Sequence, residues 1–264
     1  MKKFKMGIIW IISCCLLCGC SKQGARDTGE NAKLPVIVVG CDDYSPFSYA
    51  DANGEMTGID VELAREAFAR MGYNPKFEFI SWEDKKNLLR DGKIDCIWSS
   101  FTMTDREEEY NWAGPYMHSH QVVAVNEDSD IQTLEDLKGK TIAVQSTTKP
   151  EDMIRSHDGT LPKLRKVISV QKRDLIFILL SKGYVDALAA HDTSVDQFMS
   201  DTGLKFRILE EPLQSVDLGV AFDKNDDRGI NVELTKVLSQ MQADGSTKKI
   251  ISKYLSNVED YLED

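Results

Sequence analysis

Short apolar runs alternate with amphipathic segments along most of the chain. The runs are rich in β-branched residues. We predict strands from them at residues 35–40, 77–80, 94–99, 141–145 and 185–190, with a further apolar run at 216–222. Strands that are separated by helices are typical of parallel α/β sheets. The pattern alone therefore predicts an α/β protein, and it shows no internal repeat.

Helices are predicted where apolar residues recur at helical spacing behind a capping residue. Asp60 is placed to cap a helix whose apolar face holds Val61, Ala64, Phe68 and Met71. Two capping-box patterns, at residues 104–107 and 133–136, are each expected to start a helix. Further helices are predicted from residue 148 or 149, over 174–181, from 230 to a stop at 244–245, and over 250–255.

The N-terminus has the composition of a secretion signal. Three lysines among the first five residues precede an apolar run over residues 6–17. This run is shorter than the roughly 20 residues that span a membrane. It ends in Leu17-Cys18-Gly19-Cys20, which resembles the bacterial lipobox. The resemblance implies that residues 1–19 are a signal peptide and that Cys20 receives lipid, such as palmitate. The alternatives are an ordinary cleaved signal peptide and an uncleaved anchor helix.

The segment after the lipidation motif differs from everything that follows it. Residues 21–33 contain no large apolar side chain. Such a composition favours disorder. We therefore expect residues 20–33 to form a lipidated, disordered tether for the folded part of the chain.

Composition narrows the classes of partner. The formal net charge is −11, and loss of the three lysines with the signal peptide makes the mature part more acidic. An acidic surface repels nucleic acid, so we expect no DNA or RNA partner. The roughly 245 residues that remain are enough for two modest domains or one large domain. No later apolar run approaches membrane length.

Cysteine usage argues against a metal site. Of the six cysteines, only Cys41 and Cys96 lie beyond Cys20. Neither has a histidine nearby at the spacing of zinc ligands, so no metal is expected. Both lie at or in predicted strands, which leaves two buried thiols or one disulfide. We favour the thiols.

Five segments, in order, resemble the extracellular solute-binding proteins of family 3, which bind polar amino acids. They are residues 42–47 with 53–64 (DDYSPF and NGEMTGIDVELA), 92–95 with 102–106 and 113–116, 137–148 (LKGKTIAVQSTT), 183–187 (GYVDA) and 242–246 (QADGS). The resemblance spans residues 35–256. It depends on five motifs in the right order, because no one of them is specific alone.

This resemblance implies a fold and a function. The fold is a two-lobed α/β architecture of the periplasmic-binding-protein-like type II, with mixed sheets, flanking helices and a hinge of two crossing strands. Lobe 1 is expected at 35–117 plus 218–264 and lobe 2 at 118–217. The implied function is a lipoprotein of an ABC importer, outside the cell membrane, that binds a free polar amino acid and delivers it to the permease subunits. We expect a monomer without a cofactor.

The resemblance also assigns residues to the ligand carboxylate. Arg106 matches the arginine that holds the carboxylate, although it follows its threonine by two residues where the family has three. A planar guanidinium can bind both oxygens of a carboxylate. Thr147 and Thr148 match the residues that add hydroxyl and N–H donors from the other lobe. Without the resemblance, Arg106 is better explained as a surface arginine paired with the glutamates that follow it.

The ammonium and the side chain need different partners. Ser100 and Thr102 match positions that offer oxygen atoms to the ammonium. The family's acidic residue falls on His191 by spacing, but we prefer Asp192, because a neutral histidine is a poor counter-charge. Tyr44 and Trp82 match the aromatic residues that flank the ligand side chain. The carboxylates of Asp42 and Asp43 are close to this subsite in the sequence and are candidates to favour a cationic ligand.

Two other functions are compatible with the same fold. One is an enzyme similar to cyclohexadienyl dehydratase, for which His191 and Asp192 are the only candidate acid or base. The other is a sensory module, whose covalent forms carry a transmembrane helix and a kinase domain that we do not find here. Both are less favoured than a binding protein.

Overall fold

The buried strands join into a single mixed sheet. A computed structural model describes residues 33–156 and 161–262 of the chain. The predicted signal peptide, Cys20 and all of the tether except Lys33 lie outside the described residues. Residues 34–264 form one unit, and the sheet runs through it in the order β4-β1-β5-β11-β6-β9-β7-β8, with β10 beside β6.

The strands are short except for two. Their bounds are β1 Val36–Cys41, β4 Asn74–Phe79, β5 Cys96–Ile97, β6 Asn111–Asn126, β7 Thr141–Gln145, β8 Lys166–Val170, β9 Ala187–His191, β10 Phe206–Ile208 and β11 Gln214–Phe222. Strand β1 is parallel to β4 and β5, and β7 is parallel to β8 and β9. The long strands β6 and β11 are antiparallel to each other, which makes the sheet mixed. A small hairpin of β2 Tyr49–Ala50 and β3 Met56–Thr57 lies apart.

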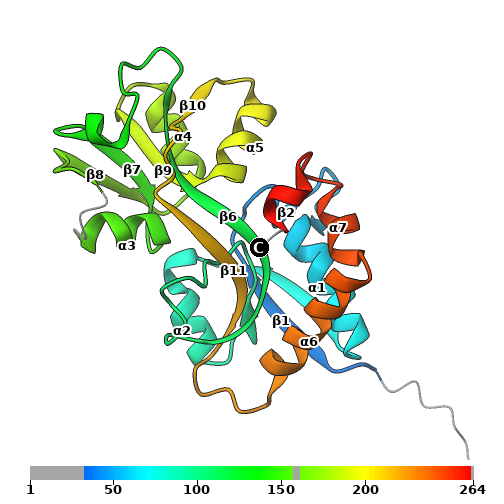
Figure 1. The fold of residues 1–264 in the computed structure, drawn as a ribbon. Coiled ribbons are helices and arrows are strands. Elements are labelled where there is room, and N and C mark those ends of the chain that lie inside the picture. The colour runs from blue at the N-terminus through cyan, green and yellow to red at the C-terminus, as the bar shows by residue number, and fades with distance from the viewer. Residues whose placement is uncertain (1–32, 157–160, 263–264) are drawn as a thin grey trace, which may run out of the picture. The chain divides into compact units, whose positions relative to one another are not determined.

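Helices cover the sheet on both sides of β6 and β11 (Figure 1). They are α1 Ile59–Arg70, α2 Lys85–Arg90, α3 Lys149–Ser156, α4 Asp174–Ser181, α5 Asp192–Thr202, α6 Ile230–Ala243 and α7 Ser246–Ile251, with 3-10 turns η1 Trp82–Asp84, η2 Leu134–Leu137 and η3 Val258–Tyr261. None of the described helices is long and apolar enough to cross a membrane.

The apolar cores divide at the two long strands. Two clusters hold buried residues between 37 and 117 and between 216 and 258. Two others hold buried residues between 122 and 213. The first part of β6 pairs with β11, whereas its last residues pair with β9 and β10. The two halves of the unit thus have separate cores and share β6 and β11.

A bulge interrupts the pairing of β6 and β11. The register shifts between Leu218 and Val220. A Cβ atom on the intervening Gly219 would lie 2.9 Å from the Trp112 side chain and 3.1 Å from the Ala113 carbonyl oxygen. Only glycine fits this close approach of two strands.

Several predicted elements are confirmed, but the helix predicted from Thr104 is wrong. Strand β7 and helix α4 have the predicted bounds. The helix expected from Thr104 does not form, and residues 104–110 are turns instead. Thr104 uses its hydroxyl to accept a hydrogen bond from the Asp217 amide (2.8 Å), and Asp105 has a φ of 59°. A contact with β11 therefore replaces the expected cap.

Two other local predictions need correction. The N-cap of α1 is Gly58, not Asp60, whose carboxylate is buried inside the protein. The last predicted helix, over 250–255, is observed earlier, as α7.

Both cysteines beyond the tether are free thiols. Cys41 and Cys96 are fully buried. The Cys41 thiol donates to the Trp98 carbonyl oxygen at 3.4 Å. The preference for thiols over a disulfide is confirmed.

Candidate functional site

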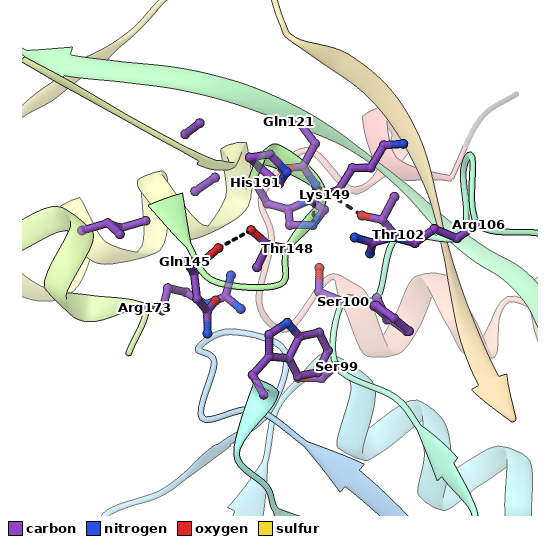
Figure 2. A pocket seen from close by; sticks show the side chains of 16 residues that line it. Ser99, Ser100, Thr102, Arg106, Gln121, Gln145, Thr148, Lys149, Arg173 and His191 are labelled. Carbon is purple, nitrogen blue, oxygen red and sulfur yellow. Dashed lines mark hydrogen bonds between the residues drawn. The ribbon is translucent and has the colours of Figure 1, made fainter. Parts of the chain in front are cut away.

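A polar pocket lies where the two halves meet. Loops after β5, β7 and β8 and the end of β9 supply most of its walls, and β6 supplies one residue. This agrees with the rule that ligands bind beyond the carboxyl ends of strands in α/β sheets. The polar lining residues are Ser99, Ser100, Thr102, Arg106, Gln121, Gln145, Thr148, Lys149, Arg173 and His191 (Figure 2). Trp82, Phe101, Pro150, Ile176, Ala189 and Ala190 complete the lining.

Arg106 lies on the turns between β5 and β6. Its side chain is 8% exposed and forms an ion pair with Asp152 of α3, which is 55% exposed. The guanidinium carbon lies 5.4 Å from the centroid of the Phe101 ring. The Arg106 carbonyl oxygen also accepts a hydrogen bond from the Trp112 indole (2.9 Å). Arg106 is therefore held by its backbone and by an aromatic ring, while its ionic partner faces water.

Asp60 fixes the Ser100 segment from behind. Its carboxylate accepts hydrogen bonds from the Ser100 amide (2.6 Å) and the Tyr116 hydroxyl (2.9 Å). Burial raises the pKa of Asp60 to about 7, although these two donors oppose the shift. Ser100 has a φ of 46°, a rare conformation for a non-glycine residue. The buried hydrogen bond to Asp60 stabilises that conformation and leaves the Ser100 hydroxyl at the pocket.

Lys85 connects α2 to the loop after β7. Its ammonium donates to the Thr147 carbonyl oxygen (2.9 Å) and hydroxyl (2.8 Å) and to the Trp82 carbonyl oxygen (3.1 Å). It also lies 4.6 Å from the centroid of the Trp82 ring. Burial, followed by the repulsion of Arg106, lowers the pKa of Lys85 to about 7. Thr147 thus contacts Lys85 in a cavity next to the pocket.

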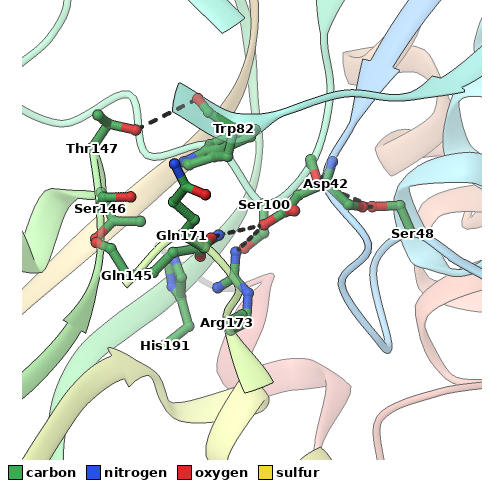
Figure 3. Close-up of polar contacts among 12 residues, drawn as sticks. Asp42, Ser48, Trp82, Ser100, Gln145, Ser146, Thr147, Gln171, Arg173 and His191 are labelled. Carbon is green, nitrogen blue, oxygen red and sulfur yellow. Dashed lines mark hydrogen bonds and ion pairs between the residues drawn. The ribbon is translucent and has the colours of Figure 1, made fainter. Parts of the chain in front are cut away.

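Arg173 lies directly before α4, at the end of β8. The guanidinium carbon is 3.3 Å from the centroid of the Tyr44 ring, and Nη2 donates to the Asp42 carboxylate at 3.0 Å. The same Asp42 oxygen accepts from the Gln145 amide nitrogen at 2.8 Å. Figure 3 shows the Arg173 side chain pointing toward Asp42 and Ser100. The cation from one half is therefore bound to an aromatic ring and a carboxylate of the other.

His191, and not Asp192, lines the pocket. The His191 ring contacts the Ser119 hydroxyl (2.8 Å) and the Gln121 amide nitrogen (2.9 Å). Burial, assisted by nearby cations, lowers the pKa of His191 to about 3, so the ring is neutral. The Asp192 carboxylate accepts from the Ser119 hydroxyl (3.1 Å) and contacts His120 (3.3 Å). Asp192 therefore does not line the pocket but is connected to the lining residue His191 through the Ser119 hydroxyl.

Buried polar atoms without a partner gather at this site. Among the described residues, those at the pocket are Trp82 Nε1, Gln121 Oε1, Gln145 Oε1 and Arg173 Nε. Unpaired buried polar atoms are rare in folded proteins, and each requires an explanation. A concentration of them on one pocket indicates that the site binds a polar molecule.

The predicted residues fall into two groups. Trp82, Ser100, Thr102, Arg106 and Thr148 line the pocket together. The other three predicted residues surround it: Tyr44 lies under Arg173, Thr147 contacts Lys85, and Asp192 bonds to Ser119.

Five polar lining residues were not assigned a role from the sequence. They are Ser99, Gln121, Gln145, Lys149 and Arg173. Gln145 ends β7 and Arg173 follows the end of β8, where the α/β rule places ligand contacts. The sequence predicted the strand that ends at Gln145 but not the strand before Arg173, and it does not show which strand ends meet.

The site shows no set of groups for a metal. Within the part of the chain that the structure describes, no cluster of three His, Cys, Asp or Glu side chains could hold a metal ion. The hydroxyls, amides and cations that line the pocket are instead suited to bind a small polar molecule through hydrogen bonds and charge.

A mixed sheet with two cores, two shared strands and a polar pocket between them defines a ligand-binding protein. The model of the bacterial extracellular solute-binding proteins, family 3, matches residues 36–257, and the chain belongs to this family. It is 27% identical to the probable amino-acid-binding protein YxeM of Bacillus subtilis, over 97% of this chain and 96% of that one.

Two further comparisons agree with this family. The chain is 27% identical to the L-cystine-binding protein TcyA of Bacillus subtilis, over 96% of this chain and 97% of TcyA. A crystal structure of a mutant of ArgBP from T. maritima superposes with a TM-score of 0.74 at 30% identity, over 84% of this chain and 95% of that one. These relatives are named as binding proteins, not as enzymes.

Proposed function

We propose that this protein is the substrate-binding lipoprotein of an amino-acid ABC importer and that it binds a free amino acid in the pocket between its halves. The observation that carries the proposal is the group of unpaired buried polar atoms beside the buried Arg106. The names of the relatives support an amino acid as the ligand class.

The proposed contacts follow the chemistry of the ligand. Arg106 binds the α-carboxylate in exchange for Asp152, and the first turn of α3, with Thr148, adds donors from the other half. The hydroxyls of Ser100 and Thr102 accept hydrogen bonds from the ammonium. Asp192 acts through Ser119 and His191 rather than by direct contact.

The remaining predicted residues complete the site. Trp82 packs against the ligand side chain, and Tyr44 and Thr147 hold the adjacent residues Arg173 and Lys85. The protein has no chemical step to catalyse in this proposal. Its residues bind, orient and enclose the ligand.

Binding is proposed to couple to closure. The halves, taken as lobe 1 at 35–117 plus 218–264 and lobe 2 at 118–217, rotate about β6 and β11. A ligand that contacts both lobes stabilises the closed form, which docks on the permease. We further propose cleavage after residue 19 and lipid attachment at Cys20, with the protein acting as a monomer at the outer face of the cell membrane.

The first experiment identifies the ligand. Thermal unfolding is measured with each of the twenty amino acids. A ligand at a hundred times its dissociation constant adds about 2.7 kcal/mol to the free energy of unfolding. A panel in which no amino acid raises the melting temperature would contradict the amino-acid assignment.

The second experiment tests the assigned carboxylate contact. Arg106→Ala is expected to weaken binding of that ligand by about 2–5 kcal/mol in calorimetry, because it removes one partner of a buried charged contact. Arg90→Ala is the control, since Arg90 belongs to the same half and its side chain is 64% exposed. Equal affinity of wild type and Arg106→Ala would show that Arg106 does not hold the ligand.

A further inference from the structure

The pocket carries cations and no carboxylate. Arg106, Lys149 and Arg173 line it, and none of the lining residues is Asp or Glu. The one lining histidine, His191, is neutral because burial lowers its pKa to about 3. The three cations are paired with aspartates outside the lining, Asp152, Asp105 and Asp42 in turn, so a cationic ligand side chain would find no free counter-charge here.

The acidic residues expected to attract a cation are not available for that role. The Asp42 carboxylate already accepts from Arg173 and from Gln145, through the same oxygen. Its side chain is 15% exposed. Asp43 lies in a neighbouring cavity, not in the pocket lining. The charge of Asp42 thus serves to hold Arg173.

Arg173 is fixed but not saturated. Its side chain is 9% exposed, stacked on Tyr44 and paired with Asp42. Its Nε is nevertheless buried without a hydrogen-bond partner. A guanidinium has five N–H donors in a rigid fork, so a second carboxylate can bind while the contact with Asp42 persists. The orientation is set before the ligand arrives.

The two arginines lie on opposite sides of the pocket (Figure 2). Arg106 also borders the cavity with Lys85 and Asp152, whereas Arg173 borders the cavity with Asp42 and Asp43. Ser100 and Thr148 lie between the two arginines in the view of Figure 2. If one arginine holds the α-carboxylate, the other faces the far end of the ligand.

We propose that Arg173 forms a second anion subsite and that the ligand is an amino acid whose side chain ends in a carboxylate. This inference rests on the proposed function, because it takes Arg106 as the partner of the α-carboxylate. It names the substrate class that the pocket selects, an amino acid with two carboxylates.

The test compares ligands that differ by one charge. Calorimetry on the purified protein uses three dicarboxylic amino acids, L-aspartate, L-glutamate and L-2-aminoadipate. The amides of the first two and the cationic amino acids L-arginine and L-lysine are the comparisons. At least one dicarboxylic ligand is expected to bind ten times more tightly than its amide or than either cationic amino acid. Tighter binding of an amide or of a cationic amino acid overturns the inference and leaves the proposed function intact.

A variant separates recognition from folding. Arg173→Gln is expected to lower affinity for the dicarboxylic ligand at least tenfold and for the amide less than threefold, and Arg173→Lys should recover part of the loss. Arg165→Gln removes the same charge from the same half at a side chain that is 69% exposed, and should change neither affinity. If Arg173→Gln weakens binding of the acid and of the amide equally, Arg173 acts only in closing the two halves, and the second anion subsite is overturned. If no amino acid binds at all, the proposed function fails as well.

Discussion

The two ends of the pocket hold their arginines in different ways. Arg173 is stacked on Tyr44 and paired with Asp42, whose side chain is 15% exposed. Arg106 is equally buried, but its partner Asp152 is 55% exposed and water can replace it. A buried pair is costly to break, whereas an exposed partner contributes little. Arg173 is therefore held in position before a ligand binds, whereas Arg106 can exchange Asp152 for a ligand carboxylate.

The largest expected effect lies at the fixed end. Asp42→Ala leaves the buried Arg173 guanidinium without its carboxylate, so the free energy of unfolding should fall by about 3–5 kcal/mol. Chemical denaturation measures the loss. If the halves separate and hydrate Arg173, the loss is smaller and the radius of gyration from X-ray scattering is larger. A variant as stable and as compact as wild type would mean that the pair contributes nothing to closure.

An effect of comparable size is expected at Lys85, beside Arg106. The pKa of Lys85 is lowered to about 7, compared with about 10.4 in an unfolded chain. Between these values the unfolded chain binds the proton and the folded protein does not. Stability should therefore rise with pH above 7, by up to about 1.4 kcal/mol per pH unit, and this group adds no slope below pH 7.

Substitution isolates the contribution of that one group. Lys85→Met should abolish the rise of the free energy of unfolding with pH, as measured by denaturation curves between pH 7 and 10. Lys86→Met, at a neighbouring side chain that is 62% exposed, should keep it. Parallel pH profiles for wild type and Lys85→Met would show that the lysine keeps its ordinary pKa.

The smallest effect is expected at the exchangeable end. Asp152→Ala removes an exposed partner, and the free energy of unfolding should change by less than about 1 kcal/mol. Ligand affinity, measured by calorimetry, should rise up to fivefold, because the ligand carboxylate no longer competes with Asp152 for Arg106. Weaker binding would instead place Asp152 among the groups that assist the ligand, and the contrast between the two ends would be lost.

Local patterns predicted the fold better than they predicted the site. Strand β7 and helix α4 are found at their predicted bounds because periodicity and caps are local properties. The helix at Thr104 was wrong because the Asp217 amide, 113 residues away in sequence, uses the capping hydroxyl. Short polar α2 carries too few apolar positions to give a periodic signal.

The site depends on which strand ends face one another. Arg106 and Thr148, which line the pocket, lie within the segments matched by the family motifs. Arg173 lies outside every motif, and its importance arises from a ring and a carboxylate that are about 130 residues earlier in the chain. No pattern within a short window of sequence contains that information.

The two buried cysteines have a practical consequence. Cys41 and Cys96 are fully buried thiols, and burial raises the pKa of both. A thiol reagent reacts with the thiolate, so neither should be modified while the protein is folded. With Cys20 acylated, as proposed, a cysteine placed on each half would accept a fluorescent dye selectively. Energy transfer between the dyes would follow opening and closing directly, and slow labelling of Cys41 and Cys96 would count unfolding events in the same sample.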